Sequence, residues 1–557
     1  MAARPLLAAL VATWPGIATW AAPPPAPNAG TILQQAQPTA PPAAAPNNSG
    51  LSIEQAPAAT LPPSVPFLVS HIEITGNTRV ATKTLHALVA SAEGQRITLP
   101  ELSALTARIT DYYHAHGYPL ARAILPAQTL HDGVVRIEVL EARYGKVSVS
   151  NHSRVHSSLL ESTLGDLKSG SVVTSSSLDR GLLLLSDIPG LSMTATLKPG
   201  AEVGSSDLDV STESSQPIIG NLTVDDGGDR YSGRARVGAA MSVLNPLHQG
   251  DALELNALSS GSGMNYGRMS YDALVDAEGT RVGAGYSGLH YRLSGRLSDL
   301  DAHGDAQDAT VFVKQPIIRS RSANLYVQAQ YDHLQLNDDI GASELQTRRH
   351  LNNLSATVSG DWRDGWLTGG LNTWAATWTG GRVSFDNAAA ETGDAAGANT
   401  QGRFSKWNLS LGRLQRLGDY DTLYVAASGQ WTNGNLDPSQ QLVLGGPLSV
   451  RAYEVSAISG DVGWELTTEA RHTFPRIWHG QWQTIAFVDD AHLSINKNVF
   501  APGPNSASLN GAGVGLSWAG PDRWTAGLTV AAPIGSRPEL AGSTNSVRVW
   551  AQVNKVF

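Results

Sequence analysis

A single arginine, Arg451, stands among glycines, small residues and aliphatic residues in GGPLSVRAYEVSAISGD at 445–461. Tyr453 follows two positions later, and the stretch has no histidine or cysteine that could act in catalysis. A guanidinium in a confined site can form two parallel hydrogen bonds with a carboxylate. The alternative is a loop charge exposed to solvent, which contributes little to stability. The stretch therefore offers an electrostatic contact rather than a reactive group.

Other patterns that could carry chemistry are weak or missing. GAGYSG at 283–288 matches G-x-G-x-x-G, but an alternating segment follows it where a dinucleotide site needs a helix. Asp489 and Asp490 are adjacent, so on a strand they face opposite sides and cannot act as a paired acid and base. The sequence has no G-x-S-x-G, H-E-x-x-H or P-loop motif and no cysteine. We therefore expect no enzyme activity, no cofactor and no metal site.

The composition indicates an exported protein of several domains. The 557 residues exceed one ordinary domain, and the net charge of −9 without a basic face argues against a nucleic-acid partner. Residues 1–21 combine Arg4, a short apolar run and small residues before the proline-rich segment, which is typical of a secretory signal peptide. A buried apolar helix is the alternative. No later run approaches the roughly 20 apolar residues of a membrane helix.

Residues 22–65 form a Pro/Ala-rich linker, because such a composition cannot bury enough apolar surface to fold. TILQQAQ at 31–37 could form a short helix before Pro38. Two copies of a β-α-α-β-β unit follow, over 66–141 and 142–214. In the first copy Thr98 and Glu101 form a capping box. A face of apolar residues at helical spacing follows them.

The pattern changes at Gln216 from helical spacing to strict alternation. In KWNLSLGRL at 406–414, tryptophan and leucines alternate with polar residues, and no convincing helix interrupts the rest of the chain. Polar segments such as NAAAETGDAAGANTQG at 387–402 are expected to be turns. A soluble β-sandwich would also alternate, but not over so long a run. We expect residues 215–557 to form a transmembrane β-barrel of 16 antiparallel strands.

At this point the sequence resembles the two-partner secretion transporters of the outer membrane, the haemolysin and filamentous-haemagglutinin secretion type within the Omp85 superfamily. The resemblance covers nearly the whole chain and rests on HIEITGNT, LTARITDYYHAHGYPLARAILPAQTLHDGVVRIEVLEA, NPLHQGD, GGPLSVRAYE and FVDDA. It implies that the two repeats are POTRA domains, modules that handle unfolded polypeptide, on the periplasmic side of an outer-membrane barrel of a Gram-negative cell.

The resemblance also gives Arg451 a partner. In the family a long loop at the eleventh-to-twelfth strand pair folds into the barrel lumen, and the arginine of its V-R-G-Y motif meets the aspartate of an F-x-D-x-G motif. The corresponding residues of this chain are Val450, Arg451, Tyr453, Phe487 and Asp489. Both motif glycines are alanines here, Ala452 and Ala491, a change that restricts the local backbone but leaves both charges.

The family also implies a function, export of a large secreted exoprotein of the β-helical adhesin or cytolysin type. The transporter would act as a monomer in contact with outer-membrane lipid. Candidate cargo-binding residues of the first repeat are Tyr112, Tyr118, Leu125 and Gln128, although core positions are the simpler interpretation of the tyrosines. A passive porin, which needs no periplasmic modules, and an insertase of the same superfamily, with more repeats, are the alternatives. NAGTILQQAQ at 28–37 resembles the start of the family's pore-plugging helix, shortened by prolines to a weak plug.

Overall fold

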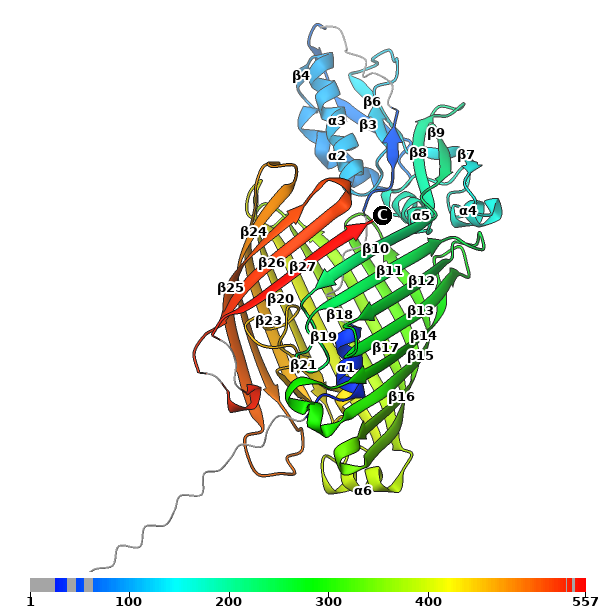
Figure 1. Cartoon of the computed structure of the whole chain (residues 1–557). Coiled ribbons are helices and arrows are strands. Elements are labelled where there is room, and N and C mark those ends of the chain that lie inside the picture. The colour runs from blue at the N-terminus through cyan, green and yellow to red at the C-terminus, as the bar shows by residue number, and fades with distance from the viewer. Residues whose placement is uncertain (1–25, 38–46, 55–63, 537, 543–545) are drawn as a thin grey trace, which may run out of the picture.

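The computed structural model describes residues 26–37, 47–54, 64–536, 538–542 and 546–557. The expected signal peptide and half of the expected linker lie outside these residues. A β-barrel holds most of the chain, two small α/β units sit at one of its mouths, and an N-terminal helix, α1 (Ala29–Ala36), lies inside it (Figure 1). The C-terminus lies at the same mouth as the two units (Figure 1).

The first unit packs two helices on one face of a three-stranded sheet. Strand β3 (His71–Thr75) pairs in parallel with β6 (Val134–Leu140), and β5 (Arg122–Ile124) pairs antiparallel with the other edge of β6. The helices are α2 (Thr82–Val89), extended by η1 (Ala90–Ala92), and α3 (Leu99–Ala115), while β2 (Phe67–Leu68) and β4 (Arg96–Ile97) form a separate pair.

The predicted capping box at the start of α3 is present. Thr98 accepts a hydrogen bond from the backbone of Glu101, and the Glu101 side chain accepts one from the backbone of Thr98. Alternate residues of β6, Val135, Ile137 and Val139, are buried against the helices, as the period-two pattern predicts.

The second unit repeats this order and gains a strand from the linker. Its elements are β7 (Arg143–His152), α4 (Ser157–Thr163), α5 (Ser175–Ser186), β8 (Leu191–Pro199) and β9 (Ser205–Ser214). The sheet has the order β1-β8-β9-β7, in which β1 (Leu51–Ile53) comes from the segment before the first unit and pairs in parallel with β8. One edge of this sheet is therefore covered by the chain's own linker.

Sixteen antiparallel strands close the barrel, and the last pairs with the first. This confirms the fold expected from the alternation. In chain order the strands are β10 (Ile218–Asp225), β11 (Arg236–Leu244), β12 (Ala252–Ser259), β13 (Met264–Leu274), β14 (Arg281–Arg292), β15 (Ala302–Arg319), β16 (Ala323–Ile340), β17 (Leu345–Asp364), β18 (Gly370–Phe385), β19 (Gly402–Arg416), β20 (Asp421–Thr432), β23 (Val462–Thr473), β24 (Gln481–Ser494), β25 (Ser506–Ala519), β26 (Trp524–Pro533) and β27 (Arg548–Val556).

Side chains along the strands alternate between lipid and lumen. On β19 the side chains of Trp407, Leu409 and Leu411 are exposed on the outer face. Asn408, between them, points inward and donates a hydrogen bond to Gln430 at 2.9 Å. An apolar outer face and a polar lumen are what a transmembrane barrel requires.

The expectation that no helix interrupts the barrel region was wrong at one place. The segment expected to be a turn contains helix α6 (Ala388–Ala396), because a run of alanines in a long loop has high helix propensity. Short 3-10 turns occupy other connections: η2 (Gly295–Leu300), η3 (Gly341–Ser343), η4 (Pro438–Gln440), η5 (Pro521–Arg523) and η6 (Glu539–Ala541). Among the described residues, no helix has both the length and the apolar character needed to cross a bilayer.

Candidate functional site in the barrel lumen

The connection between β20 and β23, the eleventh and twelfth barrel strands, folds back into the barrel. It forms a small hairpin of β21 (Leu442–Leu444) and β22 (Ile458–Gly460). The turn of this hairpin begins at Gly445, whose φ of +101° favours glycine. We call residues 445–461 the lumen loop. Its apolar side chains pack on the inner wall in one cluster that includes Val450, Ala452, Tyr453, Phe487, Ala491, Leu493 and Leu509.

Arg451 and Asp489 meet at the tip of the lumen loop. The Arg451 Nε and Nη2 atoms donate to the two carboxylate oxygens of Asp489 at 2.9 and 2.7 Å, and the Arg451 backbone N–H donates to the same carboxylate at 3.0 Å. The guanidinium carbon lies 3.4 Å from the centre of the Phe487 ring, in a cation–π contact. Asp489 is 1% exposed, so this forked ion pair is shielded from bulk solvent.

A second carboxylate, which the sequence reasoning missed, completes the arginine's surroundings. The Arg451 Nη1 atom donates to Glu469 at 2.6 Å, and Glu469 is also paired with Arg471 at 2.6 Å. Both residues lie on β23, where they occupy inward-facing positions. The stretch WELTTEARH at 464–472 contained a sequence signal for this contact. Glu469 and Arg471 are two positions apart, so on an alternating strand both face the lumen, where buried charges need partners.

Other polar contacts fix the rest of the loop. Glu454 pairs with Arg234 at 2.6 Å and with Arg548 at 2.8 Å, which ties the loop to the first and last parts of the barrel. The Trp550 indole N–H donates to the Arg451 carbonyl at 2.8 Å. Because β27 pairs with β10 in the closed barrel, these contacts fasten the loop along one continuous arc of the wall, from β23 through β27 to the start of β11.

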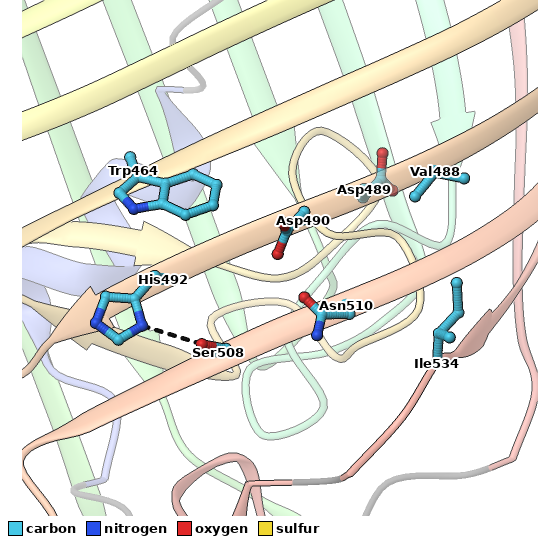
Figure 2. Close-up of a pocket in the computed structure, with 8 residues that line it drawn as sticks. All are labelled: Trp464, Val488, Asp489, Asp490, His492, Ser508, Asn510 and Ile534. Carbon is cyan, nitrogen blue, oxygen red and sulfur yellow. Dashed lines mark hydrogen bonds between the residues drawn. The ribbon is translucent and has the colours of Figure 1, made fainter.

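The two neighbouring aspartates of β24 face opposite sides, as the strand period requires. Asp489 points to the lumen loop, whereas Asp490 points to the outer face beside His492 (Figure 2). A shallow groove there is lined by Trp464, Val488, Asp489, Asp490, His492, Ser508, Asn510 and Ile534. The two carboxylates therefore do not form one acid–base site.

Helix α1 fills another part of the lumen. Asn28 caps the helix through a reciprocal pair of hydrogen bonds with Thr31. Ile32 and Leu33 are buried against inward-facing residues of the barrel. The same cluster includes Met264, Tyr266, Leu289, Tyr291, Leu334, Leu336, Leu351, Val383 and Phe404. The helix is as short as the prolines in the sequence predicted, but its apolar side chains are packed rather than loosely held.

Polar contacts anchor both ends of α1. The backbone N–H of Ala29 donates to Asp338 at 2.7 Å, and Asp338 also pairs with Arg349 at 2.7 Å. Gln35 donates to Ser456 of the lumen loop at 2.8 Å, and Gln37 donates to Ser287 at 3.0 Å. The helix and the lumen loop are therefore joined by a hydrogen bond between side chains.

The candidate cargo residues of the first unit differ in their surroundings. Tyr112, Tyr118 and Leu125 are partly buried and pack against the core of the unit. Gln128 is exposed, but its amide group makes two hydrogen bonds of 2.8 Å with the backbone of Arg136 on β6. The Gln128 side chain thus extends the hydrogen bonding between β5 and β6 beyond Ile124, where β5 ends. Its amide group is therefore already hydrogen-bonded within the unit.

A closed sixteen-stranded barrel with two inserts in its lumen and two α/β units at one mouth is typical of a membrane transporter with domains outside the bilayer. The chain belongs to the haemolysin secretion/activation protein family ShlB/FhaC/HecB, whose model matches residues 204–518. The model of the ShlB-type POTRA domain matches residues 67–142, which is the first unit.

Relatives of known function span most of the chain. The heme/hemopexin transporter protein HuxB of Haemophilus influenzae is 27% identical over 496 residues, which cover 86% of this chain and 85% of that protein. The outer membrane transporter CdiB of Dickeya dadantii is 24% identical over 506 residues, 85% of this chain and 84% of that protein.

Solved structures show the same fold. CdiB from Escherichia coli superposes with a TM-score of 0.70 at 22% identity, covering 90% of this chain and 92% of that one. BamA from Haemophilus ducreyi lacking POTRA domains 1–3 gives a TM-score of 0.52 at 16% identity, covering 88% of this chain and all of that one.

The family and its relatives give the class of function. The chain is an outer-membrane transporter of two-partner secretion, which works with a large secreted exoprotein. The barrel lies in the outer membrane and the POTRA domains lie in the periplasm.

Proposed function

We propose that this structure is the closed state of the transporter and that the Arg451–Asp489 pair keeps the lumen loop inside the barrel. The forked contact at 2.7 and 2.9 Å carries this proposal, since it joins the loop tip to the wall in a shielded site. Ordering a long loop costs conformational entropy, which such a charge-assisted contact offsets. Helix α1 is the second obstruction, and an exported chain must pass both.

The cargo docks, in this proposal, as an added strand on a POTRA sheet edge. On the second unit the β8 edge is covered by β1 of the linker, with Leu51, Ser52 and Ile53 opposite Ala195, Thr196 and Leu197. Three residue pairs make a weak edge contact, so a longer cargo strand could replace it. Displacing β1 would also loosen the connection to α1, because both belong to the segment before the first unit.

The cargo is an unfolded exoprotein of the β-helical adhesin or cytolysin type, which folds outside and thereby gives transport its direction. The transporter itself uses no nucleotide and catalyses no reaction. Support comes from the family, whose members are transporters. The alternating polar lumen also supports the proposal, because it is suited to an unfolded chain.

The protein functions as a monomer surrounded by outer-membrane lipid. Support comes from the closed sheet, which leaves no barrel edge to pair with another copy, and from the apolar side chains on its outer face. Light scattering with detergent correction on the purified chain gives the protein mass directly. A stable dimer mass would overturn this part of the proposal.

Ion conductance of the full-length chain in planar bilayers tests the closed state. Wild-type protein should pass little current, and Arg451→Ala should increase the time spent in open levels. In cells that also express its exoprotein partner, secretion should depend on residues 66–214. Secretion that persists without these residues would favour a passive channel.

A further inference from the structure

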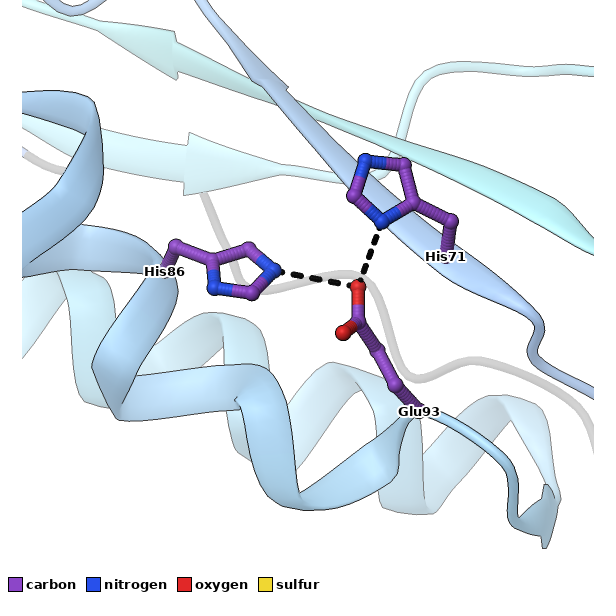
Figure 3. A group of neighbouring side chains, drawn as sticks. All are labelled: His71, His86 and Glu93. Carbon is purple, nitrogen blue, oxygen red and sulfur yellow. Dashed lines mark hydrogen bonds and ion pairs between the residues drawn. The ribbon is translucent and has the colours of Figure 1, made fainter.

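Three potential metal ligands converge in the first POTRA unit, far from the lumen. His71 lies at the start of β3, His86 on α2, and Glu93 just after η1 (Figure 3). The Glu93 Oε1 atom lies 2.8 Å from the His71 Nδ1 atom and 3.0 Å from the His86 Nε2 atom. All three ligand atoms lie within 4.8 Å of one another.

The fold holds the carboxylate in place. The backbone N–H of Ile72 donates to Glu93 at 2.8 Å, so the strand that carries His71 also orients the acid. A second contact that orients a ligand in this way is typical of metal sites.

The ligand set and its spacing suit a transition metal. Imidazole nitrogens and a carboxylate oxygen bind Zn²⁺ at about 2.0–2.2 Å, so neighbouring ligand atoms of a tetrahedral ion lie about 3.3 Å apart. The longest separation here must shorten by roughly 1.5 Å. The His71 side chain is 61% exposed, so its ring is free to rotate by that amount. Three protein ligands leave one position open to solvent.

We propose that His71, His86 and Glu93 form a Zn²⁺ site that ties strand β3 to helix α2 in the first POTRA unit. No metal site was expected, because the spacing of the three residues matches no metal-binding motif and the chain has no cysteine. The site exists only because β3 and α2 pack side by side. Its occupancy would stabilise the unit without contributing to the lumen contacts.

A metal titration of the full-length chain, purified in micelles without a histidine tag and stripped with a chelator, tests this site. Zn²⁺ is added in competition with a chromophoric chelator, and one tight equivalent is expected. His71→Ala and His86→Ala should each weaken this binding by about 100-fold or more, since even indirect partners of a metal site cost 10- to 100-fold. His131→Ala, which removes an exposed histidine of the same unit, should change nothing.

Two further measurements distinguish a loss of Zn²⁺ binding from misfolding of a variant. Glu93→Gln keeps an acceptor for the Ile72 N–H but removes the charge, so it should weaken Zn²⁺ binding while circular dichroism stays unchanged. Co²⁺ in place of Zn²⁺ should give the strong visible absorption of a tetrahedral site. If the three variants bind Zn²⁺ as the wild type does, or Co²⁺ shows only an octahedral spectrum, the side chains form a hydrogen-bonded network alone and the proposal fails.

Discussion

Gly511 of β25 lies directly against Ala452 at the tip of the lumen loop. A Cβ atom at Gly511 would lie 2.5 Å from the Ala452 Cβ atom, which is closer than two side chains can approach. Gly511 is also the strand partner of Asp489, so it sits beside the ion pair. The alanine that replaces the motif glycine in the loop is thus accommodated by a glycine on the wall.

Gly511→Ala should displace the tip of the lumen loop from the barrel wall, because the added Cβ atom would collide with Ala452. Overpacking costs about 1–3 kcal/mol, which shifts a two-state equilibrium by about 5- to 150-fold. We expect longer open times in planar bilayers, with normal barrel assembly judged by heat-modifiable gel mobility. The double variant Gly511→Ala, Ala452→Gly should restore the closed state.

Gly515→Ala on the same strand is the matched control for this change, because the nearest atom to its added Cβ lies 3.4 Å away. If Gly515→Ala opened the channel as much as Gly511→Ala does, the effect would belong to the strand and not to the contact with Ala452.

The Arg451–Asp489 pair should be coupled in secretion but dispensable for barrel assembly, because sheet hydrogen bonds close the barrel. Arg451→Ala and Asp489→Ala should each impair secretion strongly. The double variant should lose less than their sum, with a coupling of about 0.5–3 kcal/mol. Arg451→Lys should fail in part, since an ammonium cannot make the forked contact. Secretion per folded transporter is measured in a double-mutant cycle.

Glu469 makes the cycle more informative. It receives one hydrogen bond from Arg451, whereas Asp489 receives three, so Glu469→Gln should have the smaller effect. The exposed pair of Arg292 and Asp301 serves as a control and should be nearly neutral. Additive losses at Arg451 and Asp489 would mean that the arginine contacts cargo instead.

Sequence patterns predicted the barrel and the repeats because each depends on local periodicity. The period-two run after Gln216 and the capping box at Thr98 are properties of neighbouring residues, and both appear in the structure. The position of α6 was missed because a polar, glycine-containing segment was expected to be a turn, although its alanines favour a helix.

Contacts between distant segments could not be predicted in the same way. Arg451 and Asp489 were paired by family resemblance, and nothing in their spacing requires it. The contribution of Glu469 and the position of Gly511 depend on strand register, which alternation alone does not fix. The pairing of β1 with β8 joins a three-residue linker segment to a strand more than 130 residues away, and no local signal marks it.

Deleting residues 23–40 should raise conductance only modestly. The deletion removes α1, but the lumen loop loses one hydrogen bond with it, from Gln35 to Ser456, and keeps its own anchors. Secretion should stay largely intact. Single-channel recordings and secretion are compared with the wild type. A complete loss of secretion, or a current as large as that of an empty sixteen-stranded pore, would show that α1 has a larger role.

Docking of the second POTRA unit on the barrel should depend on Asp187 and Arg319. The Arg319 Nε and Nη2 atoms each donate to Asp187 at 2.7 Å, and the arginine side chain is 0% exposed. Asp187→Asn removes the carboxylate from this buried arginine, which keeps its hydrogen bond to Asn324 at 3.0 Å. Breaking a buried ion pair costs up to about 3–5 kcal/mol. Amides of α5 should then exchange hydrogen at least tenfold faster by mass spectrometry.

Asp166→Asn, which neutralises an exposed acid of the same unit, should leave that exchange unchanged. If Asp187→Asn also left α5 fully protected, the unit would be held by its apolar contacts with the barrel and not by this pair.

Acid should loosen the first POTRA unit through Glu141. Burial raises the pKa of this carboxyl, but hydrogen bonds from Thr78, Arg79 and Tyr113 outweigh it, so the pKa lies below the ordinary value of 4.5. The backbone N–H groups of Thr78 and Arg79 each donate at 2.7 Å and the Tyr113 hydroxyl donates at 2.8 Å. The ionised form therefore holds the segment after β3 against the end of the sheet.

The direction of the pH dependence follows from this lowered pKa. Below about 4.5 the unfolded chain binds a proton that the folded unit does not, so stability falls as pH drops toward the folded pKa. Between pH 5 and 7 the contribution of Glu141 is complete and constant. Hydrogen exchange of the 78–79 amides, corrected for the intrinsic effect of pH, should show protection that is lost as the pH falls below about 4.5.

Glu141→Gln should remove the pH dependence and lower protection at pH 7. Glu73→Gln, which alters an exposed carboxylate paired with Arg136, should keep the wild-type profile. An unchanged acid transition in Glu141→Gln would place the sensitive group elsewhere.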